Sequence, residues 1–179
     1  KHKNLKKINN KSLVKIAIDE LKKSKKINKI FCSSDSEKIL NISKKNNINP
    51  IIRPKKLSSD TTTSYEVVLH FLHKIKNEGI NLPEIIFLIQ PTSPFFEYKL
   101  IERILKKYSE NPNANSINSF VALHHKYLAV NHTTINKYGE VKYLHYNDRK
   151  KKTLRQSSKN FFVHGNIFSF KTKAILKFK

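Results

Sequence analysis

The sequence predicts an α/β domain of Rossmann-like type, in which a mostly parallel sheet has helices on both faces and a hairpin excursion. Two observations carry this prediction. From residue 11 to residue 108, segments with apolar residues at helical spacing alternate with short apolar segments of strand character. The run 85–89 is apolar at every position, which is typical of a central parallel strand that is covered on both faces.

Each element has its own local signal. Ser34 with Glu37, and Thr63 with Glu66, have the spacing of a capping box, in which each side chain accepts a hydrogen bond from the start of a helix. A Tyr- and His-rich stretch with a turn at Gly139 predicts the excursion, over about 120–152. Helices are expected over about 11–25, 35–46, 64–78 and 98–108, and strands over about 30–32, 50–52, 85–89, 116–123 and 161–170.

Composition limits the class of protein. The chain has 179 residues, of which 38% are hydrophobic, so a single domain over 1–179 can build a core. No apolar run approaches the roughly 20 residues that a membrane helix needs. The first ten residues carry four lysines where a secretory leader has an apolar region. We therefore expect a cytoplasmic protein without a membrane partner.

The basic excess raises the hypothesis of a nucleic-acid-binding protein. Lys and Arg together number 36 against 13 Asp and Glu, a net charge of +23. Only 4 of the 36 are Arg, the residue that base and phosphate readers favour, and the lysines are scattered along the whole chain. Such a lysine, asparagine and isoleucine bias is also what an adenine- and thymine-rich genome produces. We expect no specific nucleic-acid partner.

Metal chemistry has little support in the sequence. Cys32 is the only cysteine, so it can form no internal disulfide and lacks the partners of a zinc site. The histidines at 124, 125, 145 and 164 have no recognised ligand spacing. We expect no metal ligands within this chain.

Four polar segments follow predicted strands or precede the first helix, where an open parallel sheet binds its ligands. They are residues 3–4, 33–35, 53–64 and 90–93. In the segment Gln90-Pro91-Thr92-Ser93-Pro94 the two prolines fix the backbone, which suits a ligand-binding loop. The alternative is an ordinary helix start with Ser93 as N-cap and Pro94 at the first helical position.

These segments resemble a known family. Four segments carry the resemblance, namely Lys3-Asn4-Leu5, the loop Arg53-Pro54 with Leu57, Asp60 and Ser64, the run from Gln90 to Pro94, and Arg155-Gln156 with Gly165. Their order and spacing resemble those of the acylneuraminate cytidylyltransferases, also called CMP-sialic acid synthetases. The strand that ends in Q-P-T-S-P is the most specific element. The resemblance extends over nearly the whole chain.

The resemblance implies an enzyme that activates a nonulosonic sugar acid with CTP, needs Mg²⁺ and releases pyrophosphate. By the same resemblance, Lys3 is the catalytic lysine at the triphosphate and Asn4 holds the nucleotide. Arg53 lies near the cytosine, Ser64 lies in the nucleotide pocket, and Gln90 faces the acceptor sugar. The excursion occupies the place of the family's dimer contact, so a homodimer is implied.

The remaining matched residues are also assigned to substrate binding. Asp60 belongs to the nucleotide loop, Thr92 and Ser93 to the loop that starts at Gln90, and Arg155 and Gln156 to the sugar side. Purely structural alternatives stay open, because Arg53 could pair with Asp60, and Asp35 or Asp60 could cap a helix without touching a ligand.

The chain also departs from the family pattern. The usual Arg two residues after P-T-S-P is Phe96, and the usual Asn before the glycine is His164. The sequence contains no Met. We expect the family's phosphate loop upstream of Lys1 and its metal carboxylates beyond Lys179, so that the domain is incomplete at both ends. Alternatives to a sialic acid are legionaminate, pseudaminate or 3-deoxy-manno-octulosonate as the acceptor, or a non-catalytic relative that binds a nucleotide or a polyanion.

Overall fold

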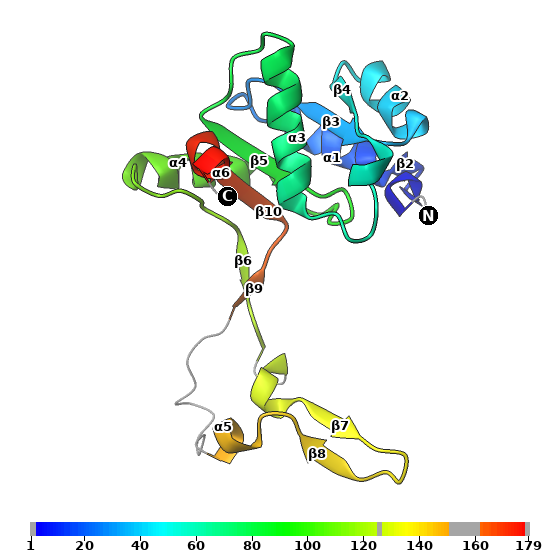
Figure 1. The fold of residues 1–179 in the computed structure, drawn as a ribbon, viewed down its shortest axis with the longest axis vertical. Helices are drawn as coiled ribbons and strands as arrows, with labels where there is room; N and C mark the ends of the chain where they lie inside the picture. The colour runs from blue at the N-terminus through cyan, green and yellow to red at the C-terminus, as the bar shows by residue number, and fades with distance from the viewer. Residues whose placement is uncertain (1–2, 125–126, 151–161, 178–179) are drawn as a thin grey trace. The chain divides into compact units, whose positions relative to one another are not determined.

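The computed structural model describes residues 3–124, 127–150 and 162–177 of the chain (Figure 1). The chain forms two compact units. Unit 1 comprises Lys1–Asn118 and Asn166–Lys179, and unit 2 comprises Ser119–Gly165. The expected excursion, 120–152, falls inside unit 2.

Unit 1 follows the predicted alternation of helices and strands. After a short 3-10 helix, η1, the chain forms a small β-hairpin and then alternates α-helices with strands until it leaves for unit 2, from which it returns as a strand and a last helix. These elements are η1 (Lys3–Leu5), β1 (Lys7–Ile8), β2 (Lys11–Ser12), α1 (Leu13–Leu21), β3 (Phe31–Ser34), α2 (Glu37–Lys45), β4 (Asn49–Ile52), η2 (Lys55–Leu57), α3 (Ser64–Asn77), β5 (Ile85–Ile89), α4 (Tyr98–Glu110), β10 (Ile167–Lys171) and α6 (Thr172–Lys177).

The strand pairs of unit 1 are of both kinds. β3 and β4 run parallel, with Phe31 opposite Asn49 and Ser34 opposite Ile52. The strand at 85–89 was predicted with correct bounds, but its described partner is the antiparallel β10, with Ile89 opposite Ile167. An apolar run shows that a strand is covered and does not show the direction of its neighbour. The α/β fold is confirmed, with helices and with parallel and antiparallel strands.

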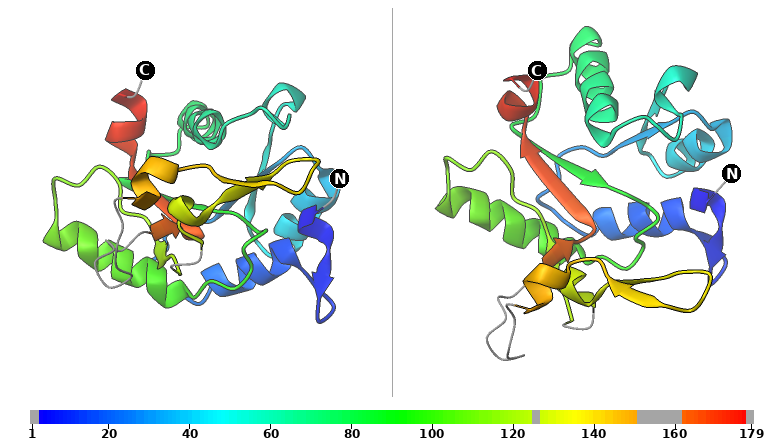
Figure 2. Two further views of the ribbon diagram at one scale, coloured as in Figure 1. Left: turned by 90° about the horizontal axis from the view of Figure 1, so that it is seen from below. Right: turned by 60° about the horizontal axis from the view of Figure 1, so that its bottom comes forward.

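Side chains of β5 alternate between two apolar clusters, because successive strand residues point to opposite faces. Ile85, Phe87 and Ile89 pack in a cluster with α4 residues that include Ile101 and Ile104. Ile86 and Leu88 pack in a second cluster, with Val68, Leu72 and Ile75 of α3. Figure 2 shows α3 and α4 on opposite sides of the β5–β10 pair. Helices therefore cover both faces of this pair, as predicted.

The helix starts test the expected caps. Thr63 and Glu66 form the capping box at the start of α3. The box expected from Ser34 and Glu37 is wrong: the N-cap of α2 is Ser36, and Ser34 Oγ accepts from the Ser36 N–H at 3.1 Å. Ser93 is not an N-cap either, since α4 begins only at Tyr98.

Unit 2 contains the predicted hairpin. β7 (Thr133–Ile135) pairs antiparallel with β8 (Val141–Tyr143) across a turn in which Gly139 has a φ of 82°. β6 (Phe120–Ala122) pairs antiparallel with β9 (Phe162–His164). The unit also holds a 3-10 helix, η4 (Ala129–Asn131), and α5 (Tyr146–Lys150). The strand expected over 161–170 is thus two strands, one in each unit.

Among the described residues, no helix has both the length and the apolar character to span a membrane.

Candidate functional site

The parallel pairing of β3 and β4 brings the residues after these strands together. The Arg53 N–H donates to the Ser34 carbonyl at 2.9 Å. The Arg53 guanidinium then lies 4.0 Å from an Asp35 carboxylate oxygen, and the Arg53 side chain is 24% exposed. The pairing of Arg53 with Asp60 that the sequence left open is not what the structure shows: the partner is Asp35, and Asp60 is exposed.

Arg53 has unused hydrogen-bonding capacity. Its Nε is buried and has no hydrogen-bond partner in the part of the chain that the structure describes. A buried polar group without a partner costs about 1–3 kcal/mol, so such groups are usually paired. The guanidinium therefore offers a donor to an incoming acceptor at this edge of the sheet.

The loop after Arg53 is ordered by short local hydrogen bonds. Ser58 Oγ donates to the Pro54 carbonyl at 3.2 Å, and Ser59 Oγ lies 2.9 Å from both the Thr61 and the Thr62 hydroxyl oxygens. The loop delivers Ser64 as the first residue of the 14-residue helix α3, with its side chain exposed. A helix N-terminus of this length attracts anions.

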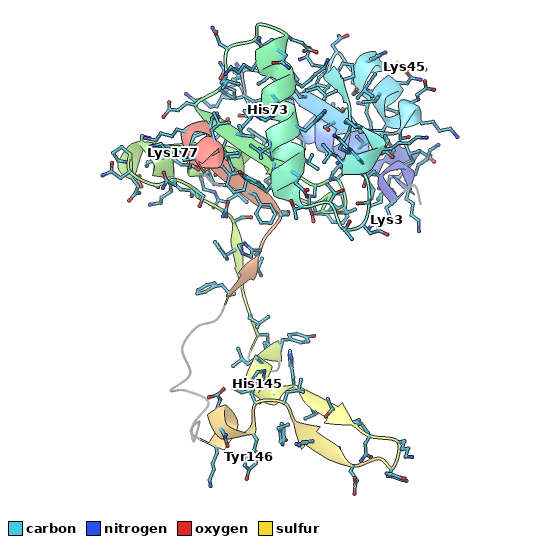
Figure 3. All side chains as sticks on the ribbon, viewed as in Figure 1. Lys3, Lys45, His73, His145, Tyr146 and Lys177 are labelled. Carbon is cyan, nitrogen blue, oxygen red and sulfur yellow. The ribbon has the colours of Figure 1, made fainter. Side chains whose placement is uncertain are left out.

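The N-terminal segment is held against α1. Lys3 and Asn4 lie in η1, and the following hairpin turns at Asn9 and Asn10, whose φ values of 48° and 62° fit a two-residue hairpin turn. The Leu13 N–H donates to the Lys6 carbonyl at 2.9 Å, which ties the hairpin to the start of α1. Lys3 is exposed, as Figure 3 also shows, whereas Asn4 Oδ1 is buried and has no hydrogen-bond partner within the described ranges.

The loop after β5 presents polar side chains from a fixed backbone. The Ser93 N–H donates to the Gln90 carbonyl at 3.0 Å, which closes a turn over the first proline. Gln90 and Thr92 are exposed and Ser93 is half-buried. Phe96, which replaces the usual family Arg, is 5% exposed and packs in the cluster of α4 and β5. This residue therefore anchors the loop to the core.

Helix α4, which follows the loop, is capped by another helix. The Tyr98 N–H donates to Glu20 Oε1 at 3.0 Å, and Ser24 Oγ donates to Glu102 at 2.9 Å. Glu20 lies in α1 and Ser24 just after it. The loop from Gln90 is thus fixed at one end by β5 and at the other by α1.

Sequence reasoning missed three features. Phe95 is 81% exposed beside the buried Phe96, and only the pair of aromatic residues in a polar loop signals it. Ser33 Oγ and His70 Nδ1 are buried, and neither atom has a hydrogen-bond partner among the residues that the structure describes. Burial, and then the positive charges of Lys74 and Arg53, lower the pKa of His70, so its imidazole stays neutral at neutral pH. No sequence pattern marks these atoms.

Only some of the site residues predicted from the sequence contact one another in the structure. Gln90 and Ser93 share a backbone hydrogen bond. In the part of the chain that the structure describes, no hydrogen bond or ion pair joins the side chains of Lys3, Asn4, Ser64 and Gln90 to one another. Arg155 and Gln156 lie outside the described residues. His164 is in unit 2, where its ring lies 4.8 Å from that of Phe120.

Possible metal ligands are sparse. Within residues 3–124, 127–150 and 162–177, no group of three or more His, Cys, Asp or Glu side chains could hold a metal ion. Cys32 is half-buried, and this partial burial raises the pKa of its thiol and keeps it protonated at neutral pH.

Polar loops that follow the strands of an open α/β sheet lie where proteins of this class bind their ligands, and Arg53 is among them. Comparison with known families agrees. The model of the cytidylyltransferase family matches residues 1–178, and the chain belongs to that family.

Solved structures share the fold at low sequence identity. CMP:2-keto-3-deoxy-manno-octonic acid synthetase, solved in complex with CTP, is 12% identical with a TM-score of 0.70, over 98% of this chain and 70% of that one. The 4-diphosphocytidyl-2C-methyl-D-erythritol synthase of Anaerococcus prevotii is 15% identical with a TM-score of 0.57, over 95% and 66%. A cytidylyltransferase of Leptospira borgpetersenii is 15% identical with a TM-score of 0.50, over 65% and 46%.

Proposed function

We propose that this protein transfers the cytidylyl group of CTP to a nonulosonic sugar acid of the sialic acid type, with release of pyrophosphate. Membership of the cytidylyltransferase family supports the reaction class. The sialic acid type is supported by the residues that match the acylneuraminate enzymes, above all the loop from Gln90 to Pro94.

One observation carries the proposal. Asn4 and Arg53 were assigned to the nucleotide from their motifs, and each has a buried polar side-chain atom with no hydrogen-bond partner among the described residues, Oδ1 in Asn4 and Nε in Arg53. A ligand that supplied a donor to Asn4 and an acceptor to Arg53 would satisfy both atoms. Cytosine and the nucleotide sugar carry both kinds of group.

The chemistry needs positioning and positive charge. The anomeric hydroxyl oxygen of the sugar acid attacks the α-phosphorus of CTP and forms the new P–O bond, while the bond from that phosphorus to the bridging oxygen breaks and pyrophosphate leaves. The hydroxyl proton passes to solvent. Lys3 supplies positive charge to the triphosphate, the start of α3 at Ser64 supplies a helix dipole, and Gln90 orients the acceptor.

Mg²⁺ is part of the proposal on family grounds only. It would neutralise charge on the triphosphate. Asp35 is engaged with Arg53, and the described residues contain no cluster of ligand side chains. They do not fit a protein-built Mg²⁺ site, and no step above depends on one.

The acceptor is proposed from the loop after β5. Thr92 and Ser93 offer hydroxyl groups beside Gln90, and Phe95 offers an exposed aromatic face on which the apolar side of a sugar ring can pack. Asp60, Arg155 and Gln156 complete the proposed substrate contacts.

The test is pyrophosphate release by the full-length protein with CTP and Mg²⁺, over N-acetylneuraminate, legionaminate, pseudaminate and 3-deoxy-manno-octulosonate, with ATP as the nucleotide control. We expect release that requires both CTP and N-acetylneuraminate. Release with 3-deoxy-manno-octulosonate alone would overturn the acceptor and keep the reaction. Binding of CTP without release from any sugar would favour the non-catalytic alternative.

Arg53→Ala and Arg103→Ala provide a matched pair for the nucleotide site. Arg103 is an exposed arginine on α4 and belongs to none of the matched motifs. Loss of a charged hydrogen bond is worth about 1.5–3 kcal/mol, so we expect Arg53→Ala to raise the KM for CTP by about 10–100-fold. The Arg103→Ala variant should keep the wild-type KM. Equal KM values in the two variants would refute the role of Arg53.

We also propose a homodimer through unit 2. Its exposed apolar residues include Ile135 at 69%, Tyr138 at 76% and Val141 at 60% exposure, around the β7–β8 hairpin. Exposed apolar patches of this kind mark interfaces in soluble proteins. Sedimentation should give twice the chain mass of 20.9 kDa, and a triple substitution of these residues by Ser should give the monomer. A monomeric wild-type protein at micromolar concentration would refute it.

A further inference from the structure

One edge of unit 1 carries lysines without acidic partners. All are exposed, and in the part of the chain that the structure describes none forms an ion pair. Lys23 belongs to the same run but pairs with Glu20. We name this surface the basic edge, and it consists of Lys22, Lys25, Lys26, Lys29, Lys44 and Lys45.

The topology separates the basic edge from the candidate site. Four of its lysines lie between α1 and β3, and the other two end α2, just before β4. β3 and β4 are parallel and begin side by side, where the Asn49 N–H and Nδ2 both donate to the Ile30 carbonyl, at 3.3 and 3.2 Å. Arg53 follows the other end of β4. Figure 3 shows Lys45 and Lys3 apart on this unit. A ligand on the basic edge would leave the nucleotide site free.

Helix dipoles explain only part of this charge. Lys44 and Lys45 lie in the last turn of α2, where a cation is stabilised by the negative end of the helix. Lys25, Lys26 and Lys29 lie beyond α1 and gain nothing from it. Two carboxylates have a described contact to residues 22–30, and both are engaged: Glu20 pairs with Lys23, and Glu102 accepts a hydrogen bond from Ser24. Several positive charges therefore repel one another without local compensation, which an anionic partner would supply.

The neighbouring residues select the kind of anion. Residues 21–30 and 41–49 contain no aromatic side chain on which the bases of a single strand could stack. Their apolar residues Leu21, Ile27 and Ile30 are half-buried and are not free to enter a lipid surface. Lysine contacts a phosphate as a point charge, and contacts to phosphate carry no sequence information. We propose that the basic edge binds the phosphate backbone of double-stranded nucleic acid without sequence preference.

Two variants with equal net charge test whether binding depends on the basic edge itself or only on the total number of lysines. Each replaces four exposed lysines by Gln and lowers the net charge from +23 to 23 − 4 = +19. The edge variant replaces Lys25, Lys26, Lys29 and Lys45. The control variant replaces Lys38, Lys99, Lys142 and Lys173, which are exposed and form no ion pair among the described residues. Circular dichroism and the melting temperature serve as the control that both variants are folded.

The measurement is fluorescence anisotropy of a labelled 20-base-pair DNA duplex, titrated with the full-length protein at several KCl concentrations. Each lost phosphate contact lowers the slope of log affinity against log salt by about 0.9, so the edge variant should lose about 3–4 units of slope and at least tenfold in affinity at 100 mM KCl. The control variant should keep the wild-type slope and lose less than threefold.

Several results would overturn the proposal. They are equal losses in the two variants, no binding by the wild-type protein at 100 mM KCl, or binding to phosphatidylserine vesicles but not to the duplex. All of these readouts are independent of CTP turnover. A failure here therefore leaves the proposed enzymatic function untouched.

Discussion

The loop that presents Gln90 depends on one of two adjacent phenylalanines. Phe96 is 5% exposed and lies in the cluster of α4 and β5, whereas Phe95 is 81% exposed. Removal of a buried Phe side chain costs about 3–5 kcal/mol, because apolar burial is lost and a cavity remains. Removal of an exposed one costs within about 0.5 kcal/mol. We expect Phe96→Ala to be strongly destabilised and Phe95→Ala to keep the wild-type stability.

Urea unfolding followed by circular dichroism measures both variants under the same conditions. With a slope of about 2 kcal/mol per molar urea, the Phe96→Ala midpoint should fall by about 1.5–2.5 M, and the Phe95→Ala midpoint should move by less than about 0.3 M. In the pyrophosphate assay, Phe95→Ala should instead raise the KM for the sugar acid and leave that for CTP unchanged. Equal midpoint shifts in the two variants would refute the placement of Phe96 as the anchor.

Two further perturbations test packing and charge. Tyr108→Phe removes a buried hydroxyl that lies 3.1 Å from Ser169 Oγ. Urea unfolding should show that the free energy of unfolding falls by about 1–3 kcal/mol. An unchanged midpoint would contradict a stabilising hydrogen bond between these two hydroxyl groups. Burial alone would raise the pKa of Glu20, but hydrogen bonds from Lys23 and from the Tyr98 N–H outweigh it, so its pKa is lowered from 4.5. A carboxyl group whose pKa is lower in the folded state stabilises the fold fully at pH values above its unfolded-state pKa. This stabilisation is lost as the pH falls through the folded-state pKa. The stability gap between wild type and Glu20→Gln should therefore be full at pH 7 and should close as the pH falls through the lowered pKa of Glu20, and a gap independent of pH would refute this account.

Local sequence signals predicted the elements well. The sequence predicted the five residues of β5 and the N-cap of α3 at Thr63, because an unbroken apolar run and a capping box are short-range features. The box at Ser34 failed because Ser36 also precedes Glu37, and the chain begins the helix at the later serine. The residue types alone do not show which of the two serines is the N-cap.

Long-range pairing was beyond the sequence. The antiparallel β10 pairs with β5 only after the 47 residues of unit 2, so the residues near β5 in the sequence do not indicate the direction of β10. The ion pair of Arg53 with Asp35, in place of Asp60, follows from the parallel register of β3 and β4. The site residues themselves came from motif resemblance. The unpaired buried atoms of Asn4 and Arg53 became visible only in three dimensions.

The most direct test of the central claim is a crystal structure of the full-length protein with CTP. We expect the nucleotide at the end of β4, with Arg53 Nε and Asn4 Oδ1 each within about 2.7–3.2 Å of a nucleotide nitrogen or oxygen atom. A nucleotide bound elsewhere, with both atoms still unpaired, would contradict the account.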